Sequence, residues 1–435
     1  MSCLFHIKNH VIDTQYIREY PRATATPDAP LKLCVKQYIP VDNIEPQYGD
    51  VTIIAAHGTG FPKELYEPLW EELLLRTKTS DFRIRAIWVA DVANQGASGI
   101  LNEQHLGNDP SWYDHSRDLI HMINHFRDQM PRPIIAVGHS LGATQLIFTS
   151  LFHPRLFASL LLIEPHVKEK ITNFDSKSLL AKTSLKRDIW PSRTIAIDKA
   201  RKVFWNWDPR VFQRWCEVGY RELPTAIHAN INGDPNNRPV TLTSTKYQET
   251  MMYIRLNLKR HTELGLEDAY GPEGHMESGP SHDPLTVPDM LGPLPPTRRG
   301  YRPEPFLAFK LVPHLRPSVL YVSGSDSPLQ AIGIHAEAAR RTGTRHGGSG
   351  GMAMERVRHV VIDQASHTLP FEKIHTTSGA LAAWIQVEKQ RWIQNEARIA
   401  AGWDEKSLRE KSTFNEEWRE FIASLLKDAK MKSKI

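Results

Sequence analysis

Residues 138–142, Gly-His-Ser-Leu-Gly, match the pattern G-x-S-x-G, in which a serine stands on a sharp turn between a strand and a helix. The glycines let neighbouring backbone approach closely, and the turn leaves the hydroxyl open to a substrate. An apolar run at 133–139 precedes the motif, and the helix-forming sequence LGATQLIFTSLF follows it. We therefore predict that Ser140 is a nucleophile with a helix N-terminus beside it to stabilise an oxyanion.

A second stretch, residues 347–351, fits the same pattern as Gly-Gly-Ser-Gly-Gly. It follows polar, arginine-rich sequence, with no strand signal before it and no helix signal directly after it. Because the chemistry needs the strand, the turn and the helix together, we predict that Ser349 lies in a loop and is not a nucleophile.

The sequence His-Gly-Thr-Gly at 57–60 closes a predicted strand over 50–58. A loop at this place supplies one of the two backbone N–H groups that hold the oxyanion. We expect these groups to be the N–H of Thr59 and the N–H of Leu141. His57 is expected to brace the loop and not to catalyse.

A nucleophilic serine of this type needs a histidine base and a carboxylate that orients it, in the chain order acid, then histidine. Asp326 follows a predicted strand over 317–324 and is the expected acid. Glu164, which ends the predicted strand 158–164, is the alternative acid. His367 lies in the loop after the last predicted strand, 354–363, and is the expected base.

Short β-branched runs alternate with helical stretches on both sides of these motifs, which predicts an α/β fold with a mostly parallel sheet flanked by helices. Further strands are expected at 31–39, 83–91 and 133–139, and helices at 63–77, 111–129, 140–152, 328–341 and 376–399.

The alternation stops after Pro165 and resumes near residue 317. Residues 168–260 have a helix-like pattern and carry an aromatic stretch, and residues 271–317 contain eleven prolines. We expect a core over 1–167 and 301–400, an inserted helical cap with a proline-rich connector over 168–300, and a helical tail over 401–435. The aromatics of the cap, Phe204, Trp205, Trp207, Phe212 and Trp215, either line an acyl pocket or belong to the core.

Composition argues against a nucleic-acid-binding, a disulfide-rich or a membrane-spanning protein. The 435 residues are 40% hydrophobic and 24% charged, with a formal charge of +5 that is spread along the chain and not gathered in a nucleic-acid-binding stripe. The three cysteines are too far apart for a disulfide framework or a cysteine zinc site, and we expect no metal and no cofactor. No apolar run approaches the ~20 residues of a membrane span, and the N-terminus does not resemble a secretory signal.

The tail carries an apolar helical face with Phe414, Trp418, Phe421, Ile422, Leu425 and Leu426, and ends in Ser433-Lys434-Ile435. This tripeptide is similar to the peroxisomal address S-K-L, with isoleucine in place of leucine. We expect a peroxisomal import receptor as a partner and the peroxisome as the location.

With G-H-S-L-G, HGTG, SGSD and SHTLPFEK in this order, the chain resembles the α/β-hydrolase superfamily over roughly 30–165 and 317–390. The family motifs carry over to Ser140, Asp326 and His367; Ala365 and Ser366 stand where many relatives have glycine. The insertion and the tail are similar to those of fungal peroxisomal hydrolases of the Alternaria AK-, AF- and ACT-toxin group, related to the yeast peroxisomal lipase. That resemblance implies a role in making a host-selective toxin of the epoxy-decatrienoic acid type.

We therefore expect a serine hydrolase that cleaves an ester or thioester of a hydrophobic, fatty-acyl-like acid. A serine at the turn argues against an epoxide hydrolase or a dehalogenase, which would carry aspartate there. An acyltransferase with the same triad and a non-catalytic binding protein of this fold are the alternatives.

Overall fold

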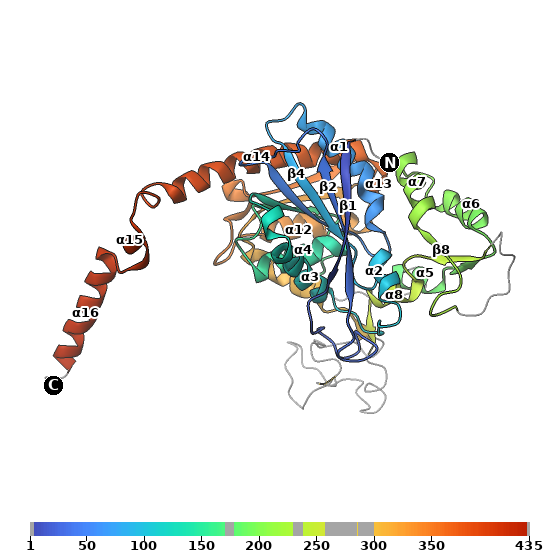
Figure 1. Ribbon diagram of the computed structural model, residues 1–435, viewed down its shortest axis with the longest axis horizontal. Helices are drawn as coiled ribbons and strands as arrows, with labels where there is room; N and C mark the ends of the chain where they lie inside the picture. The colour runs from blue at the N-terminus through green and yellow to red at the C-terminus, as the bar shows by residue number, and fades with distance from the viewer. Residues whose placement is uncertain (1–3, 170–177, 229–237, 257–284, 286–299, 433–435) are drawn as a thin grey trace. The chain divides into compact units, whose positions relative to one another are not determined.

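An eight-stranded sheet forms the centre of the computed structural model, which describes residues 4–169, 178–228, 238–256, 285 and 300–432 (Figure 1). Strands β1 (Phe5–Asp13) and β2 (Lys32–Pro40) are antiparallel and form one edge. The other six run parallel to one another, in the spatial order β4 (Ile84–Ala90), β3 (Val51–Ala56), β5 (Ile134–His139), β6 (Ser159–Ile163), β12 (Ser318–Gly324) and β13 (Val357–Ile362).

All seven predicted strands are present, within a few residues of the expected bounds, and the predicted α/β-hydrolase fold class is confirmed. Within the eight-stranded sheet, the strand that the sequence analysis did not predict is β1. Only Phe5 and Ile12 of its nine residues are buried, and most of the others are polar, so it lacks the continuous apolar run that marks the central strands. By contrast, every residue of β3, β5 and β6 is buried, as expected for central parallel strands covered on both faces.

Helices cover both faces of the sheet. Helices α1 (Glu67–Thr77) and α14 (Ile374–Ala400) contribute to the core on one face, and α3 (Trp112–His125), α4 (Leu141–Phe152) and α12 (Ile334–Arg341) to the core on the other. The shorter core helices are η1 (Lys63–Tyr66), α2 (Gly96–Leu101), η2 (Arg127–Gln129), α10 (Glu304–Leu311), η3 (Val312–His314), α11 (Pro328–Ala331), η4 (Gly351–Met354) and α13 (Leu369–Glu372).

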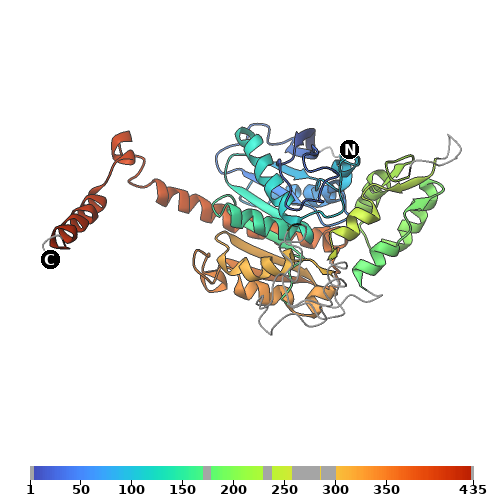
Figure 2. The ribbon, with the colours of Figure 1, turned by 90° about the horizontal axis from the view of Figure 1, so that it is seen from below.

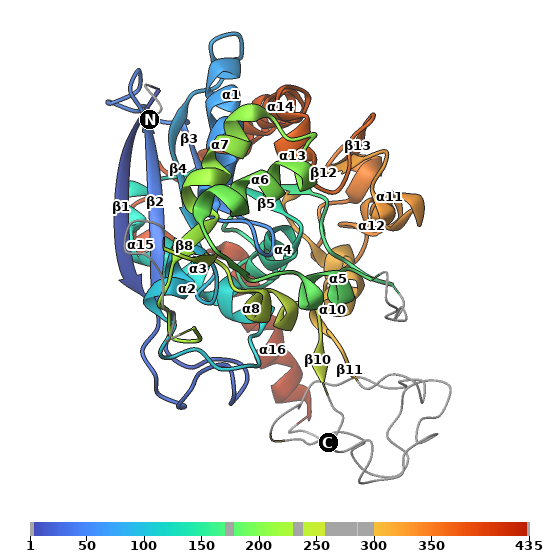
Figure 3. The same ribbon diagram turned by 90° about the vertical axis from the view of Figure 1, so that its right-hand side faces the viewer.

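The inserted region gathers at one end of the sheet (Figures 2 and 3). Its helices are α5 (Leu179–Leu185), α6 (Arg193–Val203), α7 (Pro209–Val218) and α8 (Lys246–Met251). Besides these helices the insertion contains a small sheet that the sequence did not reveal, formed by β7 (Ile189–Trp190), β9 (Val240–Leu242) and β8 (Tyr220–Glu222). Strands of two or three residues are too short to produce a periodic signal. A further pair, β10 (Arg255–Leu256) with β11 (Gly300–Tyr301), flanks the proline-rich connector, most of which lies outside the described residues.

Two compact units divide the chain after Glu388. The second contains the last turns of α14 together with α15 (Leu408–Ser412) and α16 (Glu416–Lys432). Apart from the partly buried Ile422, the side chains of the predicted apolar face of α16 are exposed. The tripeptide at 433–435 lies outside the described residues. Within the described part of the chain, none of the helices has both the length and the apolar character that a bilayer-crossing segment requires.

Candidate active site

Ser140 stands on the turn between β5 and α4. Its φ of 53° and ψ of −115° are strained for a residue with a side chain, as the nucleophile turn requires. Gly138 and Gly142 permit this turn, since a Cβ on Gly142 would lie 2.3 Å from the carbonyl oxygen of Ala56. The start of α4 is therefore held directly against the end of β3, where the HGTG loop begins.

His367 comes from the loop after β13 and reaches the nucleophile. Its Nε2 lies 2.9 Å from Ser140 Oγ, and its Nδ1 lies 2.9 Å from Glu164 Oε2. The imidazole side chain is 28% exposed, so it can still meet a substrate. The structure thus brings together a hydroxyl, an imidazole and a carboxylate in the order that a Ser-His-acid triad needs.

Glu164 follows β6 and is fully buried, with a φ of 50° that turns its side chain toward His367. Besides His367, it accepts hydrogen bonds from the backbone N–H of Gly324 at 2.9 Å and from Ser327 Oγ at 2.6 Å. Burial alone would raise the pKa of Glu164, but the hydrogen bonds from His367 and Ser327 and the nearby imidazoles outweigh burial and lower that pKa. The carboxylate is therefore ionised at neutral pH.

Asp326, the acid expected from the sequence, does not contact His367. Its side chain is exposed and accepts a hydrogen bond from its neighbour Ser325 Oγ at 2.8 Å, while Glu164 occupies the position at His367 Nδ1. The reason lies in the topology. Because β6 and β12 are adjacent parallel strands, Glu164 and Asp326 both follow strands that end at the same edge of the sheet, and only side-chain direction separates them. The alternative acid named from the sequence is the one that the geometry supports.

The HGTG loop lies beside the nucleophile with two of its N–H groups engaged. Gly58 N–H donates to Tyr66 Oη at 2.8 Å, and Gly60 N–H donates to Gln95 Oε1 at 2.8 Å. Within the described ranges, the N–H groups of Thr59 and Leu141 have no hydrogen-bond acceptor in the protein. Both residues are buried, so these two donors can serve an oxyanion.

His57 braces this loop, in line with the expectation. Its Nε2 accepts a hydrogen bond from the backbone N–H of Val92 at 2.9 Å. Complete burial lowers the pKa of His57, so the ring is neutral and can act as this acceptor.

One apolar side chain of the cap packs on the residue that follows Ser140. Met252, just after α8, forms a buried cluster with Trp112 and with Leu141, and Trp112 Nε1 donates to the carbonyl oxygen of Met252 at 2.9 Å. A cavity of about 370 Å³ lies next to this cluster, between the cap and the loop after β4, with Asn94 and Met251 in its lining. Asn94 Nδ2 also lies 3.5 Å from Met252 Sδ, so Asn94 both lines the cavity and contacts the cluster.

Most of the aromatic stretch of the cap belongs to the core. Trp207, Phe212 and Trp215 are buried, and Phe204 stacks on Trp207 with the ring centres 3.9 Å apart. Trp205 is 80% exposed. Trp207 also contacts Phe61, just beyond the HGTG loop, so an aromatic residue of the cap packs against the segment that follows this loop.

The second G-x-S-x-G match is a loop, as predicted. Among the residues that the structure describes, Ser349 Oγ accepts a hydrogen bond from the nearby Gly351 N–H, at 3.4 Å, and no imidazole bonds to it. In the part of the chain that the structure describes, no three His, Cys, Asp or Glu side chains are grouped as a metal site would require.

Sequence reasoning missed Ser327, which donates to Glu164 and fixes the carboxylate. Ser327 lies in the segment SGSDSP just after β12, and in that segment the sequence analysis chose Asp326 as the acid.

Comparison with known proteins gives the family to which the chain belongs. Residues 53–384 match the model of the alpha/beta hydrolase family. The chain is 40% identical over 405 residues to a type I acyl-CoA thioesterase, mpaH, of Penicillium roqueforti, covering 90% of each chain. It is 24% identical to the abhydrolase domain-containing protein AFT2-1 of Alternaria alternata, over 68% of this chain and 100% of that protein. The structure of the peroxisomal alpha-beta-hydrolase Lpx1 of Saccharomyces cerevisiae superposes with a TM-score of 0.61 at 16% identity, covering 100% of this chain and 99% of that one. With a serine, a histidine and a carboxylate in hydrogen-bond contact at the carboxyl ends of its sheet strands, this chain belongs to the alpha/beta hydrolase family.

Proposed function

We propose that this protein hydrolyses the thioester of a hydrophobic acyl-CoA, with Ser140 as nucleophile, His367 as base and Glu164 as the orienting acid. The observation that carries the proposal is the pair of 2.9 Å hydrogen bonds that join Ser140 Oγ to His367 and His367 to Glu164. A neutral His367 that donates from Nδ1 to Glu164 has its Nε2 lone pair directed at the serine hydroxyl.

The reaction then follows in two half-reactions. Ser140 Oγ attacks the acyl carbonyl carbon while His367 Nε2 takes the hydroxyl proton, and the N–H groups of Thr59 and Leu141 hold the oxyanion. The C–S bond breaks, and the proton on His367 goes to the leaving CoA sulfur. A water molecule, deprotonated by His367, then attacks the acyl-serine ester and releases the free acid with Ser140 restored.

Two observations favour an acyl thioester over a small polar ester. The Penicillium relative that shares 40% identity over most of both chains is named an acyl-CoA thioesterase. A buried apolar cluster adjoins the nucleophile turn, with Met252 of the cap packed on Leu141 and Trp112. An acyl chain enclosed there gains free energy from leaving water, at roughly 25 cal/mol per Å² of apolar surface.

The decisive experiment is a series of acyl-CoA thioesters from acetyl to dodecanoyl, with release of CoA followed by a thiol reagent. We expect kcat/KM to rise with chain length to about octanoyl and to exceed that of the matched p-nitrophenyl ester. Hydrolysis in H₂¹⁸O should place ¹⁸O in the free acid. Turnover that depends on an added alcohol or amine would identify an acyltransferase instead, and esters as the sole substrates would refute the thioesterase proposal.

The product and the location are finer parts of the proposal. The toxin-group resemblance points to a medium-chain epoxy acid, which mass spectrometry of the acids accumulating in producer and deletion strains would test.

Ser433-Lys434-Ile435 offers a small residue, a base and an apolar side chain to a peroxisomal import receptor. A fluorescent protein fused to the N-terminus should give peroxisomal puncta that disperse when the tripeptide is deleted, and diffuse fluorescence with the tripeptide intact would refute the import.

A further inference from the structure

A continuous chain of hydrogen bonds runs behind the triad through two buried side chains that have no part in the reaction steps above. Gly58 N–H donates to Tyr66 Oη at 2.8 Å, and Tyr66 Oη lies 2.7 Å from His139 Nδ1. His139 Nε2 lies 2.9 Å from the carbonyl oxygen of His367. A carbonyl oxygen can only accept, so His139 carries its proton on Nε2, and the tyrosine hydroxyl donates to Nδ1.

With the donors in this direction, the Tyr66 hydroxyl and both His139 ring nitrogens each have a hydrogen-bond partner. The tyrosine oxygen accepts from Gly58 and donates to His139, and the imidazole accepts at one nitrogen and donates at the other. The arrangement requires a neutral imidazole, because a proton on Nδ1 would face the tyrosine oxygen, whose own proton would then have no acceptor. Complete burial, with the neighbouring His367, lowers the pKa of His139 to about 3, so the ring stays neutral at physiological pH.

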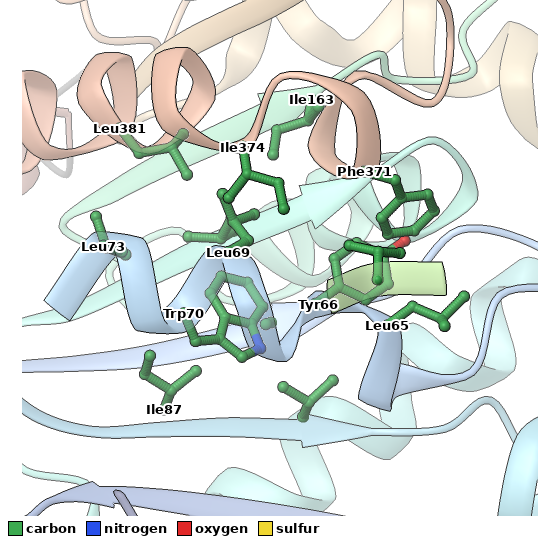
Figure 4. Close-up of a cluster of buried hydrophobic side chains, with 14 of the residues drawn as sticks. Leu65, Tyr66, Leu69, Trp70, Leu73, Ile87, Ile163, Phe371, Ile374 and Leu381 are labelled. Atoms are coloured by element: carbon green, nitrogen blue, oxygen red, sulfur yellow. The ribbon is translucent and has the colours of Figure 1, made fainter. Parts of the chain in front are cut away.

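Aromatic rings hold the two side chains in place. Tyr66 and His139 are 3% and 1% exposed. Phe61 stacks on the imidazole with ring centres 6.1 Å apart, and Phe371 of α13 meets both His139 and Tyr66 edge-on, at 5.7 Å and 5.0 Å. Figure 4 shows Tyr66 and Phe371 side by side in this cluster. Neither polar side chain can move to another hydrogen-bond partner without opening the core.

This hydrogen-bond chain connects the three loops that the reaction needs. Gly58 precedes Thr59, whose N–H is free for an oxyanion. His139 precedes Ser140. His367 receives the last hydrogen bond on its own backbone while its ring contacts Ser140 and Glu164.

We propose that Tyr66 and His139 are positioning residues that fix the HGTG loop, the nucleophile turn and the His367 loop in register through this hydrogen-bond chain. The inference rests on the proposed function, since it assigns these residues a role in the same site. Losing one link should displace the base and the oxyanion donors relative to Ser140. Catalysis is steeply sensitive to such displacement, with losses of about 10²-fold for shifts near 1 Å.

The first test compares Tyr66→Phe with Tyr321→Phe. Tyr321 is also fully buried, and among the described residues its hydroxyl bonds to Thr342 Oγ1 alone, at 2.8 Å and away from the three loops. Both variants lose one buried hydroxyl, so both should lower the melting temperature. We expect only Tyr66→Phe to lower kcat, by about 10- to 100-fold with KM within about threefold of wild type. Equal kcat values in the two folded variants would overturn the proposal.

The second test separates the two ends of the imidazole. In His139→Gln the amide nitrogen stands near the place of Nε2 and can still donate to the His367 carbonyl. In His139→Asn the amide reaches only the place of Nδ1, so that donor is lost. We expect the glutamine variant to retain at least about tenfold more kcat than the asparagine variant, and the reverse order would contradict the proposal.

Fluorophosphonate labelling of Ser140 keeps the two levels of inference apart. The labelling rate reports the alignment of Ser140 and His367 without any acyl-CoA, and it should fall in Tyr66→Phe along with kcat. If wild type labels at Ser140 and hydrolyses acyl-CoA while Tyr66→Phe labels at the wild-type rate, only the positioning role fails. If wild type labels but does not hydrolyse acyl-CoA, the substrate proposal fails, and a slower Tyr66→Phe labelling rate still supports the positioning role.

Discussion

Replacement of Glu164 by glutamine removes one negative charge while preserving the size of the side chain. In the variant, the amide oxygen can still accept from Gly324 N–H, so the amide NH₂ faces His367 Nδ1 and Ser327 Oγ. An NH₂ group opposite Nδ1 favours the tautomer with the proton on Nε2. That tautomer presents a donor to Ser140 and cannot take its proton. We expect kcat to fall on the order of 10⁴-fold, which corresponds to about 5.5 kcal/mol of transition-state stabilisation.

Asp326→Asn is the matched control, because it makes the same chemical change at the carboxylate expected from the sequence. Its side chain is exposed and, within the described ranges, hydrogen-bonds to Ser325 alone, so we expect kcat within about twofold of wild type and a stability change within about 0.5 kcal/mol. Initial rates of CoA release, measured well below the melting temperature of each variant, give the comparison. A Glu164→Gln variant with more than about a tenth of wild-type kcat, or an equal loss in Asp326→Asn, would refute the assignment.

Three further predictions concern the nucleophile, its turn and a buried carboxyl group. Ser140→Ala should lose about 10⁴- to 10⁶-fold in kcat and all fluorophosphonate labelling, whereas Ser349→Ala should lose neither. Gly142→Ala places a Cβ 2.3 Å from the Ala56 carbonyl oxygen and should cost about 10²-fold in kcat, while Gly379→Ala, whose Cβ has no neighbour closer than 3.8 Å, serves as the control with wild-type rates. Burial raises the pKa of Asp114 to about 7, above the unfolded value near 3.8. The stability that this group contributes is therefore complete below about pH 4 and lost as pH rises through 7, so Asp114→Asn should raise the melting temperature more at pH 8 than at pH 5, and an equal shift at both would contradict this.

Several features of the protein could be predicted from local sequence. The apolar run before Ser140, the two glycines around it and the helical sequence after it define the nucleophile turn without knowledge of any distant residue. The strand before His57 and the loop after the last strand similarly identified the HGTG loop and His367. These are features of one strand and its next turn, and backbone preferences with apolar periodicity encode them.

The acid and the hydrogen-bond chain behind the site depended on the tertiary structure. Glu164 and Asp326 follow neighbouring parallel strands, and a sequence places both at the same edge of the sheet without giving the direction of either side chain. The positive φ of Glu164 and its contacts with Gly324 and Ser327, about 160 residues further along the chain, decide which carboxylate meets His367. The hydrogen bonds from Tyr66 to His139 and on to His367 span 73 and 228 residues of sequence, and sequence periodicity carries no information about such contacts. They form only when the folded sheet brings the ends of its strands together, which is why Ser140 and His367 could be predicted from the sequence, whereas only the tertiary structure shows that Glu164 and not Asp326 contacts His367.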